Sequence, residues 1–140
     1  MPLAHILDLP PGIATFFVAL FALAVSHALG DFALQGDFLA LAKNPHADSD
    51  KFFGQNGKPC CLWVQALTAH SLIHAGGVWL VTGSVALGAV ELVLHWLIDF
   101  AKNEGCTSFT ADQLLHYLCK TAYATILATG AFPNLVNWSP

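Results

Sequence analysis

Four long apolar stretches limit what this 140-residue chain can fold into. A membrane-spanning helix needs roughly 20 consecutive apolar residues, within a range of about 17–25. Stretches of that kind run over residues 12–30, 62–82, 84–100 and 111–132. The sequence therefore predicts an all-α, polytopic membrane protein, with a four-transmembrane-helix bundle forming a single membrane domain over residues 1–140. The connection of residues 31–61 is predicted to be polar, with a short helix around residues 37–43 along the membrane surface. The tight turn at residues 82–84 predicts that the second and third stretches form an antiparallel hairpin.

The composition excludes several other classes of protein. Hydrophobic residues make up 56% of the chain and charged residues only 10%, whereas soluble domains carry roughly 25% charged residues. Disordered chains are rich in charge and poor in apolar residues, so disorder is excluded as well. The net charge is −4, and all five basic residues are lysines. Such a chain lacks the basic surface that nucleic-acid binding requires.

The lysines also predict an orientation in the membrane. Lys43, Lys51 and Lys58 lie in the connection of residues 31–61, and Lys102 lies between the third and fourth stretches. With four spans these two connections fall on the same side, which the positive-inside rule identifies as the cytoplasm. Both termini are then predicted to face outward. A cleaved signal peptide is disfavoured, because no lysine or arginine precedes the first stretch.

Ionisable residues recur at four-residue intervals within the predicted helices. The four sets are His27 and Asp31; His70 and His74; Glu91, His95 and Asp99; and Asp112, His116 and Lys120. Residues four apart share one face of a helix, and a charge that faces lipid is costly. We therefore expect four inward-facing polar stripes. From the helical rise, the aspartates should lie near the cytoplasmic ends, most histidines about 6 Å deeper, and His74, Glu91 and Lys120 deepest.

Imidazoles and carboxylates at this spacing are typical of metal sites. Zinc binds histidine nitrogen and carboxylate oxygen, and di-iron and di-manganese bundles use similar pairs from facing helices. The predicted ligands are His27, Asp31, His70, His95, Asp99, Asp112 and His116. Seven ligands exceed one tetrahedral site, so one or two divalent ions fit, with zinc favoured and iron or manganese as alternatives. A metal-free polar network is the competing interpretation.

The carboxylates have individual roles to consider. Asp31 or Glu91 could accept the proton of a metal-bound water, which makes both of them catalytic candidates. Glu91 could instead form a structural ion pair with Lys120. Asp112 lies near the start of its predicted helix, where an acidic residue favours the helix dipole. Asp31 and Asp99 lie near helix C-termini, where a negative charge is unfavourable, so their positions indicate a function.

Four motifs of the polar stripes resemble one protein family. They are H-A-L-G-D-F-A-L-Q (residues 27–35), T-A-H-S-L-I-H (68–74), E-L-V-L-H-W-L-I-D-F-A-K (91–102) and D-Q-L-L-H (112–116). The chain thereby resembles the domain of unknown function family 3307, small integral membrane proteins of bacteria and their phages. The resemblance implies a multi-pass protein of the bacterial inner membrane. The family pattern adds Gln35, Lys102 and Gln113 as residues that support the ligands. It does not include His74, so His74 is predicted, like Lys120, to be a supporting residue.

These features predict a membrane-embedded, metal-dependent hydrolase acting at the membrane surface on a lipid or membrane-linked substrate. The sequence contains no competing Ser-His-Asp or Cys-His arrangement and no glycine-rich phosphate loop. The alternatives are a metal or proton transporter and a metal-stabilised structural membrane subunit without catalysis, of bacterial or phage origin. The bilayer is the expected partner, nucleic acid is excluded, and oligomerisation stays open.

Overall fold

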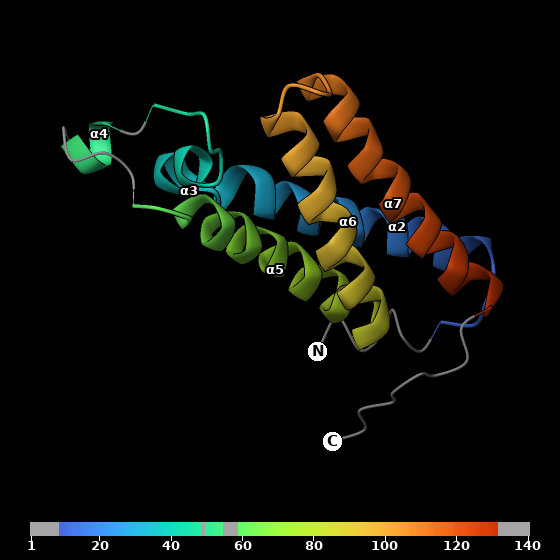
Figure 1. The fold of residues 1–140 in the computed structure, drawn as a ribbon. Helices are drawn as coiled ribbons and strands as arrows, with labels where there is room; N and C mark the ends of the chain where they lie inside the picture. The colour runs from blue at the N-terminus through green and yellow to red at the C-terminus, as the bar shows by residue number, and fades with distance from the viewer. Residues whose placement is uncertain (1–8, 49, 55–58, 132–140) are drawn as a thin grey trace.

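The chain folds into helices alone over the part that the structure describes. This computed structural model describes residues 9–48, 50–54 and 59–131 (Figure 1). The elements in chain order are α2 (Ile13–Ala28), η1 (Leu29–Ala33), α3 (Gly36–Ala42), α4 (Asp50–Phe53), α5 (Leu62–Thr82), α6 (Val85–Asn103) and α7 (Phe109–Thr129). The predicted all-α class is confirmed.

The four long helices coincide closely with the four predicted stretches. α5 has the predicted bounds, while α6 continues three residues beyond residue 100 and α7 begins two residues before residue 111. Local capping explains these boundaries. Ser84 and Ser108 accept hydrogen bonds at the starts of α6 and α7 from Leu87 N and Ala111 N, at 3.2 Å each. Gly83 follows α5 in the left-handed conformation that glycine adopts readily. Residue 132 lies outside the described residues.

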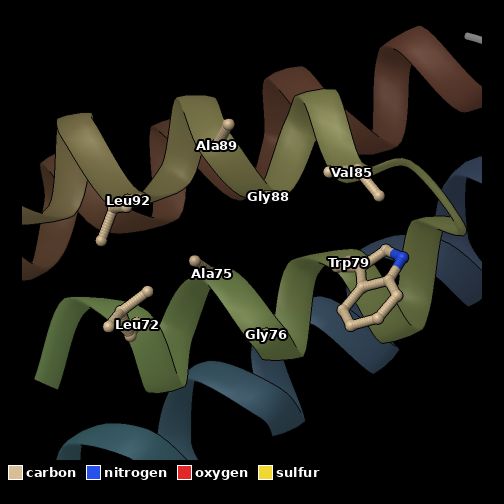
Figure 2. Close-up of a pocket in the computed structure, with 8 residues that line it drawn as sticks. All are labelled: Leu72, Ala75, Gly76, Trp79, Val85, Gly88, Ala89 and Leu92. Atoms are coloured by element: carbon tan, nitrogen blue, oxygen red, sulfur yellow. The ribbon is translucent and has the colours of Figure 1, made fainter. Parts of the chain in front are cut away.

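The long helices pack as a bundle in which each contacts two others. α5 packs on α6, α6 on α7, α7 on α2, and α2 on α5. α5 and α6 form the antiparallel hairpin predicted from the short connection at residues 82–84. The backbones of these two helices approach closely, because a side chain at Gly88 would lie 3.0 Å from the Ala75 carbonyl oxygen. Figure 2 shows the apolar groove along this pair, lined by Leu72, Ala75, Gly76, Trp79, Val85, Gly88, Ala89 and Leu92.

The connection of residues 31–61 is more ordered than predicted. η1 continues α2 as a π-helical turn, in which Leu34 N donates to Leu29 O at 2.8 Å. Such turns often occur at functional sites because they change the direction of nearby side chains. α3 follows at once and corresponds to the short surface helix expected around residues 37–43. Polar irregular structure begins only after Lys43.

Among the described residues, one helical segment is long and apolar enough to cross a membrane by length and composition. It is Ile13–Ala33, with 21 residues and a mean hydropathy of 2.0. A segment of this kind near the N-terminus could be a membrane span or a signal sequence. α5, α6 and α7 have 21, 19 and 21 residues, but their histidines, carboxylates and lysines lower their hydropathy. Composition alone therefore does not identify these three helices as spans.

The interior of the bundle has an apolar half and a polar half. The apolar core consists of Ala19, Leu23, Val78, Val81, Leu87, Tyr123 and Ala124. The polar half gathers the residues of the predicted stripes, nearer to the ends at which η1 follows α2 and α6 leads into α7. This segregation gives the polar residues a site of their own inside the bundle.

Candidate metal centre

All four polar stripes converge inside the bundle, as the helical spacing predicted. The buried members are His27 from α2, His70 and His74 from α5, Glu91, His95 and Asp99 from α6, and Asp112, His116 and Lys120 from α7. Asp31 in η1 is nearly buried, with 9% of its side chain exposed. Because neighbouring helices run in opposite directions, the end of α2, the end of α6 and the start of α7 lie at the same end of the bundle. The stripes therefore meet side by side.

Asp31, His70, His74 and His95 form the first ligand group. One ligand atom from each residue lies within 4.8 Å of all the others. Asp31 Oδ1 is 3.3 Å from His70 Nε2 and 3.1 Å from His74 Nε2. Tetrahedral zinc with bonds of about 2.0–2.1 Å separates its ligand atoms by roughly 3.3–3.4 Å. The carboxylate and these two imidazoles therefore have the spacing of a zinc site.

The hydrogen bonding of this group also fits a metal. Asp31 Oδ1, His70 Nε2, His74 Nε2 and His95 Nε2 are all buried, and none has a hydrogen-bond partner among the described residues. A buried polar atom left without a partner costs about 1–3 kcal/mol. Three imidazole nitrogens and one carboxylate oxygen are also the donor types that zinc prefers. Bound zinc would satisfy all four atoms at once.

Further contacts orient the members of the first group. Glu91 Oε1 lies 3.2 Å from His95 Nδ1 and also pairs with Lys120. Gln113 Nε2 donates to Asp31 Oδ2 at 2.8 Å. A carboxylate on the second ring nitrogen of a histidine fixes the ring and makes its other nitrogen a better metal ligand. Glu91 and Gln113 thus leave His95 Nε2 and Asp31 Oδ1 directed at the group.

The remaining predicted ligands lie close by but form a separate group. Asp99, Asp112 and His116 have ligand atoms within 4.8 Å of one another, and so do Glu91, His95 and His116. Lys102 Nζ is 3.3 Å from Asp112 Oδ2 and 3.6 Å from Asp99 Oδ1. Asp112 is buried and contacts side chains of α6, so its role goes beyond that of a first-turn acid.

Two histidines lie differently from what their sequence positions predicted. His74, predicted as a supporting residue in the deepest layer, belongs to the first group and stacks on His95 with ring centroids 3.7 Å apart. His27, predicted as a ligand, is in none of the ligand groups of the described residues. Its Nε2 instead lies 3.4 Å from Asp31 Oδ2. The physical reason is Gly30, whose missing side chain leaves room for the His74 ring beside η1.

Lys43 is a buried part of the site that the sequence did not reveal. We expected it in the polar cytoplasmic connection, yet its ammonium reaches Asp99 Oδ2 at 2.5 Å. Asn103 Nδ2 holds the Lys43 carbonyl oxygen at 3.0 Å, which ties the end of α3 to the end of α6. Burial lowers the pKa of Lys43, and the Asp99 carboxylate opposes this shift. No periodic pattern marks Lys43, because its contacts with Asp99 and Asn103 at the end of α6 place it.

Gln35 is the predicted supporting residue with the least defined role. It precedes α3 and is half-buried. Its Oε1 atom is buried and has no hydrogen-bond partner within the described part of the chain. Its place between η1 and α3 puts it on the segment that leads from Asp31 to Lys43.

Gly30→Ala is expected to weaken zinc binding about 10-fold or more, the effect typical of displacing a group that positions a ligand. A Cβ atom at residue 30 would lie 2.5 Å from His74 Nε2, and the ring is confined by its stack on His95. Competition with a chromophoric chelator in detergent measures the affinity. Gly76→Ala in α5 is the matched control, because its Cβ would meet nothing within 4 Å. Equal zinc affinity in the two variants would contradict the assignment of His74.

Comparison with known proteins identifies the family. The family described as "Protein of unknown function (DUF3307)" matches residues 19–139. This match covers most of the chain, so the protein belongs to the DUF3307 family, and the resemblance carried by the four motifs is confirmed. No curated protein and no solved structure matches the chain.

Proposed function

We propose that this protein is a membrane-embedded hydrolase with a divalent metal centre near one membrane surface. The observation that carries the proposal is the first ligand group, in which four buried donor atoms of Asp31, His70, His74 and His95 lie close together without hydrogen-bond partners in the described part of the chain. Zinc is the ion that this donor set favours, with iron or manganese as alternatives.

The distribution of polarity supports a bilayer around the four long helices. Phe21, Leu80, Val93 and Leu118, one from each helix, have between 57% and 72% of their surface exposed, while the histidines and carboxylates of the same helices are buried. Only 28% of the apolar window in Ile13–Ala33 is buried inside the bundle, which is unlike a core helix. Large apolar surfaces exposed in this way favour contact with lipid. We therefore propose four spans, with residues 31–61 cytoplasmic and the termini, which lie outside the described residues, facing outward.

The two halves of the interior favour an enzyme over a transporter. A metal or proton pathway needs polar groups that continue across the bundle. Among the described residues the buried ionisable groups end at Glu91, Lys120 and Tyr123, and the buried hydroxyls beyond them, on Thr15 and Thr82, donate to backbone carbonyl oxygens. The apolar core around Leu23 and Val78 fills the remainder. Thr125 and Thr129 beyond this level are exposed, and their hydroxyls donate to backbone carbonyl oxygens of α7. Access to the centre from one side suits a reaction at the membrane surface.

A bound zinc ion would act as a Lewis acid and lower the pKa of a water molecule on it. The chain supplies the ligands and two candidate proton acceptors. Glu91 Oε1 is engaged by His95 and Lys120, while its Oε2 is buried, has no hydrogen-bond partner among the described residues and would take the proton. Asp31 is the partly exposed carboxylate of the centre. Because the centre lies toward the helix ends, the fitting substrate is a lipid or a membrane-linked molecule.

The direct test is purification of the full chain from membranes in mild detergent, followed by elemental analysis. We expect the chain in the membrane fraction, with zinc, iron or manganese retained at one ion or more per chain through size-exclusion chromatography. Hydrolysis of lipid esters and phosphoesters in nanodiscs should be lost with a chelator and return with the metal. A chain that binds no metal would overturn the proposal.

Glu91→Gln separates the proposed hydrolase from a structural metal protein. Glutamine keeps the shape and can still accept from Lys120, but it cannot take a proton, so hydrolysis should vanish with the metal still bound. A wild-type protein that retains its metal but hydrolyses none of these substrates would instead favour the structural subunit. The buried pairs of Lys43 with Asp99 and Lys120 with Glu91 support that second candidate, because they stabilise the bundle without any reaction.

A further inference from the structure

We infer that Asp99, Asp112 and His116 form a second divalent-cation site, so that the centre holds two ions with Asp99 between them. This inference rests on the proposed first site at Asp31, His70, His74 and His95. All three residues of the second site are at least 99% buried. Their ligand atoms lie within 4.8 Å of one another.

The carboxylates of the second site present one oxygen each to the same imidazole nitrogen. His116 Nε2 is 3.4 Å from Asp99 Oδ1 and 3.6 Å from Asp112 Oδ1. Asp112 Oδ1 is buried and has no hydrogen-bond partner among the described residues. A fully buried carboxylate oxygen directed at a histidine nitrogen and a second carboxylate is the arrangement that a cation would satisfy.

Lys43 and Lys102 contact mainly the Oδ2 atoms of Asp99 and Asp112, not the Oδ1 atoms that lie near His116. Lys43 holds Asp99 Oδ2 at 2.5 Å, and Lys102 donates to Asp112 Oδ2 at 3.3 Å. Gln113 Nε2 also lies 3.3 Å from Asp112 Oδ2. Lys102 approaches Asp99 Oδ1 only at 3.6 Å. These contacts fix the orientation of each carboxylate and leave the two Oδ1 atoms toward His116.

Asp99 connects the second site to the first. Its Oδ2 is 3.5 Å from His70 Nε2, and its Oδ1 is 3.4 Å from His116 Nε2. The rings of His95 and His116 stack with centroids 4.1 Å apart, so imidazoles of the two groups are in direct contact. Hydrolytic sites with two metals place the ions about 3.5–4 Å apart, where they stabilise both the attacking and the leaving oxygen.

The surrounding charge predicts an order of binding. Four carboxylates (Asp31, Glu91, Asp99 and Asp112) and three lysines (Lys43, Lys102 and Lys120) belong to this cluster. The first divalent ion offsets the excess negative charge, and the second adds positive charge beside Lys43 and Lys102. The second ion should therefore bind more weakly than the first, and a zinc titration should show two steps.

The test is the zinc stoichiometry of the full chain in detergent, measured by elemental analysis after equilibration with zinc alone. We expect two ions per wild-type chain, one in Asp112→Asn and one in His74→Gln. Asp37→Asn is the matched control, because this aspartate is exposed in α3 and should leave the count at two. A wild-type chain that binds one ion, still bound in Asp112→Asn, would overturn the second site and leave the first intact. Loss of the only ion in His74→Gln would assign it to the first site.

A spectroscopic measurement on the wild type avoids dependence on the folding of a variant. Loaded with manganese alone, a pair of ions linked by Asp99 should give an exchange-coupled electron paramagnetic resonance spectrum. One ion per chain should give the six-line spectrum of isolated manganese. Isolated spectra at saturating manganese would overturn the two-ion centre, whereas a chain that binds neither zinc nor manganese would overturn the proposed function as well.

Discussion

His95→Ala is expected to reduce zinc affinity by more than about 100-fold, beyond the loss typical of residues that only support a ligand. His95 is the histidine shared by two ligand groups, and its ring lies between those of His74 and His116. Its buried Nε2 has no partner within the described residues, so alanine removes a ligand that nothing nearby replaces. Elemental analysis and chelator competition on protein in detergent measure the loss.

His46→Ala is the matched control for this prediction. His46 is also a histidine near a carboxylate, at 2.9 Å from Glu104, but 62% of its side chain is exposed. Its removal should leave zinc content and affinity unchanged. Asp99→Ala should resemble His95→Ala, because Asp99 lies between the two groups. Normal zinc content in His95→Ala would contradict the whole site assignment.

Lys120→Met is expected to destabilise the protein by about 3–5 kcal/mol, the cost typical of removing one partner from a buried ion pair. Lys120 and Glu91 are both about 99% buried and contact each other directly. Methionine fills a similar volume but leaves the buried Glu91 carboxylate without its partner charge. Thermal or denaturant unfolding in detergent measures the change.

Two further variants give this prediction its control. Lys51→Met removes the partner of Asp37, but that pair is exposed on both sides, so the same substitution should leave stability unchanged. Glu91→Gln combined with Lys120→Met removes both charges and should recover much of the lost stability. A double variant as unstable as Lys120→Met would show that Lys120 acts through packing and not through its charge.

Local features of the sequence predicted much of the fold. Four apolar stretches gave the four long helices, because helix length and amphipathic period depend on neighbouring residues only. The serines at residues 84 and 108 set helix starts through hydrogen bonds within one turn. The four-residue spacing of the histidines and carboxylates placed them on one face of each helix, and the bundle gathers these faces as expected.

Local sequence patterns therefore predicted which helices form and which side chains turn inward. The packing of the helices against one another selects which of these inward residues meet. His74 joins the first ligand group because Gly30 leaves space for its ring, and that space depends on how η1 lies against α5. Lys43 reaches Asp99 because the end of α3 lies beside the end of α6, where Asn103 holds the Lys43 carbonyl oxygen. Such contacts join residues far apart in the chain, so the crossing of the helices decides them and the local periodicity does not.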